Sequence, residues 1–151
     1  MSTFCEPVAV RTDWETPQWL FDQLEREFHF TLDVCATAHN TKCFNYYSEG
    51  SLGRVWTGVC WMNPPYGKEI SDWVEAAYSV ATAGLATVVC LLPARSNNSW
   101  WKWVIQGEVR FIRKKLQFVG APFVSMFPNV IVVFRPALEG GGVMKILERE
   151  A

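Results

Sequence analysis

The sequence has almost no net charge and no apolar run long enough to cross a membrane. Its 14 Lys and Arg residues balance 15 Asp and Glu residues, for a formal net charge of -1. This balance argues against a protein that coats nucleic acid nonspecifically. An N-terminal segment of the signal-peptide type is also missing. We therefore expect a cytoplasmic protein, in which any contact with a polyanion depends on a local basic patch.

Patterns typical of metal sites and nucleophilic catalysis are scarce as well. His29 and His39 are the only histidines and no acidic pair accompanies them, and the five cysteines include no C-x-x-C pair. Neither a metal site nor a disulfide framework is indicated, and there is no Ser-His-Asp order or Gly-rich phosphate loop. We interpret Cys35, Cys60 and Cys90, which lie in apolar runs, as small buried hydrophobic residues.

What the sequence does contain is enough apolar material for a packed core. Of its 151 residues, 50% are hydrophobic and 15% aromatic, including eight tryptophans. The length predicts a single domain. We place the core of this domain at about 14–136 and a tail at 137–151.

Helix signals occur at two places in the core. Thr16 is a favourable N-cap and Pro17 suits the first helical position of a helix over 16–28. A second helix is expected over 71–84, with Ser71 as N-cap and Gly84 as the C-terminal stop.

Apolar runs around these helices predict strands. The expected strands are 30–36, 43–48, 58–62, 85–95, 108–118 and 125–136, with a short helix over 97–107. Strands alternating with helices, followed by a final strand pair, indicate a three-layer α/β domain. We expect a mainly parallel sheet with a C-terminal antiparallel strand pair.

A rigid turn, Asn63-Pro64-Pro65-Tyr66, follows the strand expected over 58–62. The two prolines fix φ and remove two backbone donors, and the residue before them is held extended. The side-chain oxygen of Asn63 and the carbonyl of Pro64 are two acceptors, and each can take one N–H of a planar amino group. Tyr66 can stack on the ring that carries this group. The turn therefore suits alkyl transfer to an amino nitrogen, helped by positioning; a rigid turn without chemistry is the alternative.

Asp33 and Asn63 each come at the end of a predicted strand. Because ligands bind at the carboxyl ends of strands in open parallel sheets, we expect both side chains on one rim. Each candidate here has an ordinary structural explanation too. The alternatives are a loop cap for Asp33, a simple helix start for Thr16 and Pro17, and core packing for Trp14.

Five segments resemble one protein family, in order along nearly the whole chain. They are W-x-T-P-x-x-L-F at 14–21, LDVCATAHNTKC at 32–43, the N-P-P-Y-G turn with the following Trp73, VVCLLPAR at 88–95 and PFVSMFPNVIVVF at 122–134. N-P-P-Y after a strand is the catalytic motif of amino-group methyltransferases that use S-adenosylmethionine. The ordered set is similar to the phage-type DNA N6-adenine methyltransferases. This resemblance implies a Rossmann-like S-adenosylmethionine-dependent methyltransferase fold.

The resemblance also implies roles for the residues of the turn and the rim. Asn63 and the Pro64 carbonyl would hold the adenine N6 amino group, Pro65 would fix the turn, and Tyr66 would stack on the flipped base. S-adenosylmethionine would be the cofactor, and Asp33 would bind its methionine amino group. The other cofactor-binding residues implied are Trp14, Thr16, Pro17, Ala36 and Asn63 itself.

Double-stranded DNA with a flipped adenine is the implied partner. Basic side chains near the predicted rim loops and on the strand over 108–118 are candidates for contacts to DNA phosphates. They are Lys68, Arg95, Lys102, Arg113 and Lys115. For the residues on the strand, a charged solvated edge is the alternative. For the tryptophans at 100–103, core packing is an alternative to base stacking.

The leading hypothesis is methyl transfer from S-adenosylmethionine to adenine N6 in DNA by direct displacement, in host cytoplasm if a phage encodes the protein. The chain departs from the usual pattern because no glycine follows the first strand and no separate DNA-recognition domain is visible. Two alternatives therefore stay open. One is methyl transfer to another planar amino group, on cytosine N4, an RNA base or a protein glutamine. The other is a catalytically silent module that binds nucleic acid or cofactor.

Overall fold

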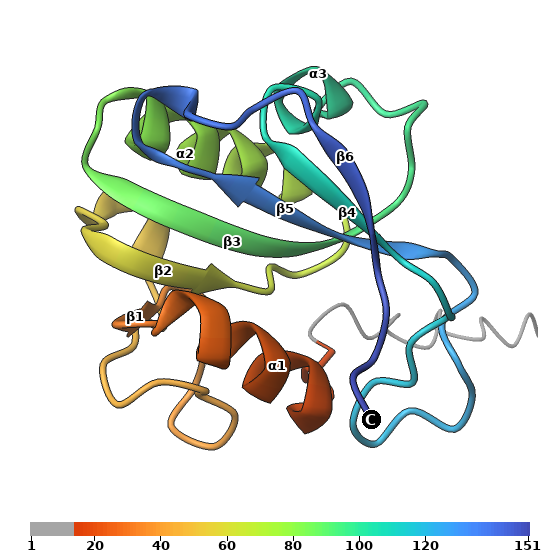
Figure 1. The fold of residues 1–151 in the computed structure, drawn as a ribbon. Helices are drawn as coiled ribbons and strands as arrows, with labels where there is room; N and C mark the ends of the chain where they lie inside the picture. The colour runs from red at the N-terminus through yellow and green to blue at the C-terminus, as the bar shows by residue number, and fades with distance from the viewer. Residues whose placement is uncertain (1–13) are drawn as a thin grey trace, which may run out of the picture.

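The computed structural model of the chain describes residues 14–151. Its centre is a six-stranded sheet in the order β1-β2-β3-β5-β4-β6 (Figure 1). The strands are β1 (Leu32–Asp33), β2 (Gly58–Met62), β3 (Ala86–Pro93), β4 (Glu108–Ile112), β5 (Asn129–Phe134) and β6 (Met144–Leu147). β1–β2, β2–β3 and β4–β6 are parallel pairs, and β5 is antiparallel to both β3 and β4. The expected mixed α/β sheet, with an antiparallel pair near the C-terminus, is confirmed.

Helices cover both faces of this sheet (Figure 1). α1 (Gln18–Phe28) lies on one face, and α2 (Ile70–Thr82) and α3 (Trp101–Val104) lie on the other. Successive residues of a strand point to opposite faces, so Val88 of β3 packs in the core cluster with α2 and Val89 in the cluster with α1. Nearly all of β3 is buried, as expected for a strand covered on both sides.

The start of α1 differs from the prediction. Pro17 occupies the N-cap position, and no side chain makes a capping hydrogen bond there. The Thr16 hydroxyl instead accepts a hydrogen bond from Asn63 Nδ2. The prediction of Thr16 as N-cap and Pro17 as first helical residue is therefore wrong by one position, because a tertiary contact takes the hydroxyl.

For α2, the predicted C-terminal end is correct but the predicted start is not. The helix begins at Ile70, with Glu69 in the N-cap position and no side-chain cap, so Ser71 lies inside the helix rather than capping it. Gly84 has φ +76 and its amide donates to the Ala81 carbonyl at 2.9 Å. Because this left-handed conformation favours glycine, Gly84 stops the helix as predicted.

Two segments have different structures from those expected. Residues 43–48 form no strand; only an isolated bridge pairs Tyr46 with Asp33. Residues 137–151, assigned to a tail, contribute β6, which pairs with β4 in parallel and forms an edge of the sheet. β4 ends at Ile112 and α3 spans four residues, so both are shorter than predicted.

The cysteine predictions hold for two of three residues. Cys60 and Cys90 are fully buried in the core, whereas Cys35, which follows β1, is only half-buried. Within residues 14–151, no helix is long and apolar enough to cross a membrane.

Candidate active site

Two cavities lie on either side of the turn that follows β2. Asn63 and Pro65 line the smaller one, of about 280 Å³, and Tyr66 lines the larger one, of about 760 Å³. Trp14 lines both. In the parallel β1–β2 pair Asp33 lies opposite Trp61, and Asp33 lines the smaller cavity together with Asn63. The common rim expected for Asp33 and Asn63 is therefore confirmed.

The side-chain amide of Asn63 is fixed by the segment that precedes α1. Its Nδ2 donates to the Trp14 carbonyl at 2.6 Å and to the Thr16 hydroxyl at 3.0 Å. Both donors of the amide are thus used, and Oδ1 points away from this segment. No donor within residues 14–151 is bonded to Oδ1 of Asn63 or to the carbonyl of Pro64. The turn therefore holds two acceptors without a partner among the described residues. Asn63 lines the smaller cavity, whereas Pro64 is buried and lines neither cavity.

Tyr66 is held by its hydroxyl and presents its ring. The hydroxyl donates to the Leu91 carbonyl at 3.1 Å and accepts from Asn129 Nδ2 at 3.2 Å. Burial raises the pKa of this phenol well above its usual range, so it stays neutral. The ring lies edge-on to Phe118, with centroids 6.1 Å apart. Since the hydroxyl is used within the fold, the ring is the part that a ligand can meet.

Asp33 is a buried carboxylate on the wall of the smaller cavity. Its oxygens accept hydrogen bonds from the backbone N–H of Cys35 at 3.2 Å and of Lys42 at 3.0 Å. Burial raises the pKa of Asp33 to about 6, while these hydrogen bonds act in the opposite direction. Asp33 therefore caps the loop, as the structural alternative expected, and also lines the smaller cavity. Such a carboxylate favours a cationic group beside it.

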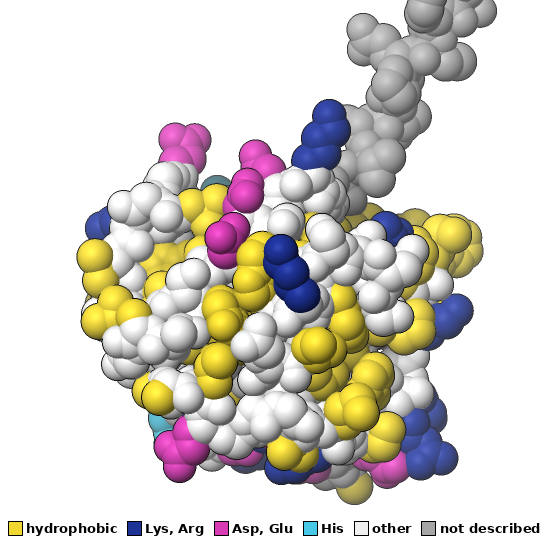
Figure 2. Space-filling model, turned by 90° about the horizontal axis from the view of Figure 1, so that it is seen from above, with side chains coloured by type: hydrophobic (Ala, Val, Ile, Leu, Met, Phe, Trp, Pro, Cys, Tyr) yellow, Lys and Arg dark blue, Asp and Glu magenta, His cyan; other side chains and the backbone are white. Residues whose placement is uncertain are grey.

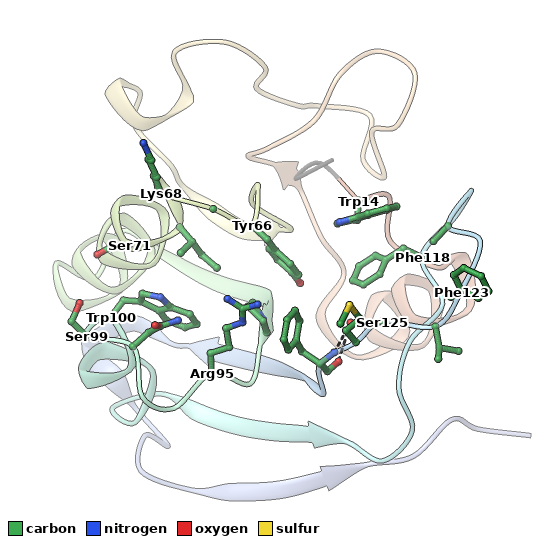
Figure 3. A pocket seen from close by; sticks show the side chains of 18 of the residues that line it. Trp14, Tyr66, Lys68, Ser71, Arg95, Ser99, Trp100, Phe118, Phe123 and Ser125 are labelled. Atoms are coloured by element: carbon green, nitrogen blue, oxygen red, sulfur yellow. Dashed lines mark hydrogen bonds between the residues drawn. The ribbon is translucent and has the colours of Figure 1, made fainter. Parts of the chain in front are cut away.

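The larger cavity has aromatic walls and basic side chains at its edge. Figure 3 shows the rings of Trp14, Tyr66 and Phe118 grouped together, with Arg95 and Trp100 on the other side of Tyr66. The guanidinium carbon of Arg95 lies 3.8 Å from the centroid of the Phe127 ring. Flat rings and cations in one cavity suit a planar ring attached to an anion.

Comparison with known proteins identifies the family of the chain. The model of the DNA N-6-adenine-methyltransferase (Dam) family matches residues 5–139. The chain belongs to the Dam family. It is 31% identical over 143 residues to the DNA N-6-adenine-methyltransferase of Haemophilus phage HP1 (strain HP1c1), with 86% of this chain and 82% of the phage protein covered. The resemblance in the five sequence segments is thereby confirmed.

The fold of this Dam-family chain gathers most of the predicted cofactor residues in one place. Trp14, Thr16, Asp33, Ala36 and Asn63 all line the smaller cavity. Pro17 is buried at the start of α1 and does not line it. Apart from Asn63, these residues come from the approach to α1, from β1 and from the loop after it, which are close only in the fold.

The predicted DNA contacts divide into two groups. Lys68 and Arg95 line the larger cavity, whereas Lys102, Arg113 and Lys115 line neither cavity. Arg113 pairs with Glu148 at 2.6 Å, and the Lys102 ammonium lies 4.6 Å from the Trp103 ring centroid. Figure 2 shows Lys and Arg side chains at separate points of one face, with exposed hydrophobic side chains between them. DNA contact by all five residues stays a prediction.

Sequence reasoning did not single out Lys42 and Glu15, which also line the smaller cavity. The Lys42 side chain is only 8% exposed. Its ammonium donates to Glu15 at 3.3 Å and to Gln18 Oε1 at 2.9 Å. Lys42 lies within the segment 32–43 that carried the resemblance, but no periodicity marked it as buried.

Trp73 and Glu49 also line the smaller cavity. The resemblance included Trp73 but gave it no role, and nothing in the sequence marked Glu49. The indole N–H of Trp73 is buried and has no partner within residues 14–151, and its ring stacks on Trp56 at 6.0 Å. No cluster of His, Cys, Asp and Glu side chains in the described residues could hold a metal ion.

Proposed function

We propose that this Dam-family protein transfers a methyl group from S-adenosylmethionine to N6 of adenine in duplex DNA by direct displacement. The whole chain would act as one domain with a Rossmann-like methyltransferase fold. The observation that carries the proposal is the anchored amide of Asn63, which lines the smaller cavity while Tyr66 of the same turn lines the larger one. Its Nδ2 is committed to Trp14 and Thr16, so its oxygen is left to accept from a substrate amino group.

S-adenosylmethionine fits the smaller cavity by charge. Asp33 and Lys42 offer a carboxylate and an ammonium for the amino and carboxylate groups of the methionine part. Glu15 and Glu49 also line this cavity, so acidic groups outnumber the cation and favour a ligand with net positive charge. When bound, the cofactor supplies an electrophilic methyl group on a positively charged sulfur.

The larger cavity suits the target base. The ring of Tyr66 would stack on the flipped adenine, and base–aromatic stacking is worth about 1–3 kcal/mol. Oδ1 of Asn63 and the Pro64 carbonyl would each accept one N–H of the amino group. The nitrogen would gain a bond to the methyl carbon as the carbon–sulfur bond of the cofactor breaks and its electron pair stays on sulfur. The positive charge would thereby pass to the nitrogen, where these two oxygens would stabilise it. The extra proton then leaves to water.

The test is a direct assay of the product. Purified protein is incubated with labelled S-adenosylmethionine and unmethylated duplex DNA, and the DNA is digested to nucleosides. We expect labelled N6-methyladenine from the wild type. The variant Asn63→Ala should give none, while cofactor binding by calorimetry persists. Asn97→Ala, an exposed asparagine that lines neither cavity, should behave like the wild type.

The same assay decides among the alternatives. The two acceptors fit any planar amino group, so labelled N4-methylcytosine in the digest would move the target to cytosine. Methylated product on RNA or protein glutamine alone would leave the turn as the site of methyl transfer and replace DNA as the substrate. DNA binding without cofactor binding would leave a silent module. Full activity of Asn63→Ala would overturn the mechanism.

A further inference from the structure

Exposed hydrophobic side chains are concentrated in one segment at the edge of the larger cavity. They are Val119, Phe123, Val124, Met126 and Phe127. Phe123 is 79% exposed and Met126 is 81% exposed. Figure 3 shows Phe123 on the far side of Phe118 from Tyr66. An exposed apolar patch of this kind marks a surface that meets a partner.

This segment is held in place at both ends. The amide of Val119 donates to the Glu15 carbonyl at 3.1 Å, and the amide of Ser125 donates to the Leu116 carbonyl at 2.6 Å. The Ser125 hydroxyl also donates to the Phe127 carbonyl at 2.9 Å. The exposed side chains are therefore carried by an anchored loop, and Glu15 connects it to the segment that fixes Asn63.

The surroundings of the segment favour a nucleic acid over a protein partner. Arg95 stacks on Phe127 at 3.8 Å and is exposed, and Lys68 lines the same cavity. Cations at this edge can bind phosphates, while apolar side chains between them can contact bases. Proteins that distort duplex DNA combine these two features by inserting apolar wedges between base steps.

We propose that Phe123 and Met126 enter the base stack of duplex DNA and fill the space that the target adenine leaves when it turns into the larger cavity. The proposal rests on the proposed function. Extruding a base breaks its stacking on both neighbours, and an apolar side chain in the gap restores contact with them. The exposure of these two side chains in the free protein is then explained by their burial in the complex.

The experiment uses the full chain with substitutions at both positions. Sites methylated by the wild type on unmethylated genomic DNA are sequenced, and duplex oligonucleotides with one such site are made. One set carries 2-aminopurine at the target position, because its fluorescence rises when it leaves the stack. A second set carries the target adenine opposite an abasic site, where it is already unpaired.

For the double variant F123A/M126A we expect kcat/KM on the paired duplex to fall by about tenfold or more and the 2-aminopurine signal to be lost. When the target adenine lies opposite an abasic site, the activity of the double variant should return to within about threefold of wild type. Phe44→Ala is the matched control, because Phe44 is 99% exposed and lines neither cavity. It should match the wild type on both duplexes.

Several outcomes would overturn the wedge. One is an unchanged 2-aminopurine fluorescence rise in the double variant, and another is no recovery of its activity opposite the abasic site. A third is a difference in molar mass between the double variant and the wild type by light scattering, which would assign the surface to self-association. A wild type that methylates no DNA would instead refute the proposed function. The two failures are therefore distinguishable.

Discussion

Asn63 Nδ2 lies 3.0 Å from the hydroxyl oxygen of Thr16. This contact joins the turn after β2 to the segment that precedes α1, and the Trp14 carbonyl accepts from the same nitrogen at 2.6 Å. An amide has two donors on one side and its oxygen on the other. Fixing the donors therefore fixes the direction of the acceptor that would hold the substrate amino group.

Thr16 should thus act as a positioning residue. Thr16→Val keeps the shape of the side chain and removes the acceptor for Asn63. A hydrogen bond of this kind contributes about 1 kcal/mol net, so kcat for methyl transfer to DNA should fall by roughly fivefold. Cofactor affinity by calorimetry should change less than kcat. Thr16→Ser retains the hydroxyl and should restore the rate; failure of this rescue would contradict the positioning role.

Cofactor binding should depend on pH through Asp33. The pKa of this carboxyl is about 6 because of burial, so it is ionised above that pH and neutral below it. Only the ionised form attracts the cationic amino group of the cofactor. Affinity should therefore be constant above pH 7 and fall by up to about tenfold per pH unit below 6. Calorimetry without DNA measures this affinity. The variant Asp33→Asn should bind the cofactor weakly at every pH. If its affinity depended on pH as steeply as that of the wild type, Asp33 would not be the titrating group.

Lys42 should contribute to cofactor affinity. Lys42→Met keeps an unbranched side chain of similar length and removes the cation from the smaller cavity. Hydrogen bonds to charged groups contribute about 1.5–3 kcal/mol, so the cofactor Kd should rise by about tenfold or more. Lys114→Met is the control, because Lys114 is exposed and lines neither cavity. Equal Kd values for the two variants would remove Lys42 from the site.

The ring and the hydroxyl of Tyr66 should have separable roles. Tyr66→Phe removes the bonds to Leu91 and Asn129 and should lower the free energy of unfolding by roughly 1–2 kcal/mol. Its methylation rate should stay within about threefold of wild type, since the ring is retained. Tyr66→Ala should lose about tenfold or more in rate because stacking is lost. Urea unfolding and the DNA assay measure the two effects, and equal rates for both variants would exclude stacking.

Glu108 should stabilise the fold at neutral pH. Burial opposes ionisation, but hydrogen bonds from Arg110, Arg135 and Lys145 lower its pKa to about 2. Because the folded pKa is below the usual 4.5, this contribution is present above pH 4.5 and is lost as the pH falls toward 2.

Glu108→Gln should therefore lower the free energy of unfolding by roughly 3 kcal/mol at pH 7, as expected when one partner of a buried pair is removed. The difference from wild type should shrink in urea unfolding at pH 3. Glu139→Gln, at an exposed position, should have little effect. A constant difference across this pH range would contradict the role of the carboxylate charge.

Local sequence was sufficient for the parts of the site that lie within one segment. The two prolines fix the Asn63–Tyr66 turn whatever surrounds it, and the apolar run of β3 predicts a strand covered on both faces. The starts of α1 and α2 were harder, and at α1 a tertiary contact takes the hydroxyl that propensity assigned to the cap. Thr16 is the clearest case, since its hydroxyl bonds to Asn63 rather than to the helix.

Long-range pairing was beyond the reach of local patterns. β6 exists because the edge of β4 accepts residues 144–147, and the local sequence of the tail did not indicate a strand. The burial of Lys42 depends in the same way on Glu15 and Gln18, which belong to a different segment.

By itself the sequence predicted the type of chemistry, because the acceptors of Asn63 and Pro64 and the ring of Tyr66 follow one another in a stiff turn. It also determined the family, through five ordered segments. Only the tertiary structure decided which cavity each residue lines, how the Asn63 amide is oriented and which basic side chains lie at the cavities. The reason is that these properties depend on contacts between residues far apart in the chain, and the energies of such contacts exist only once the sheet has brought them together.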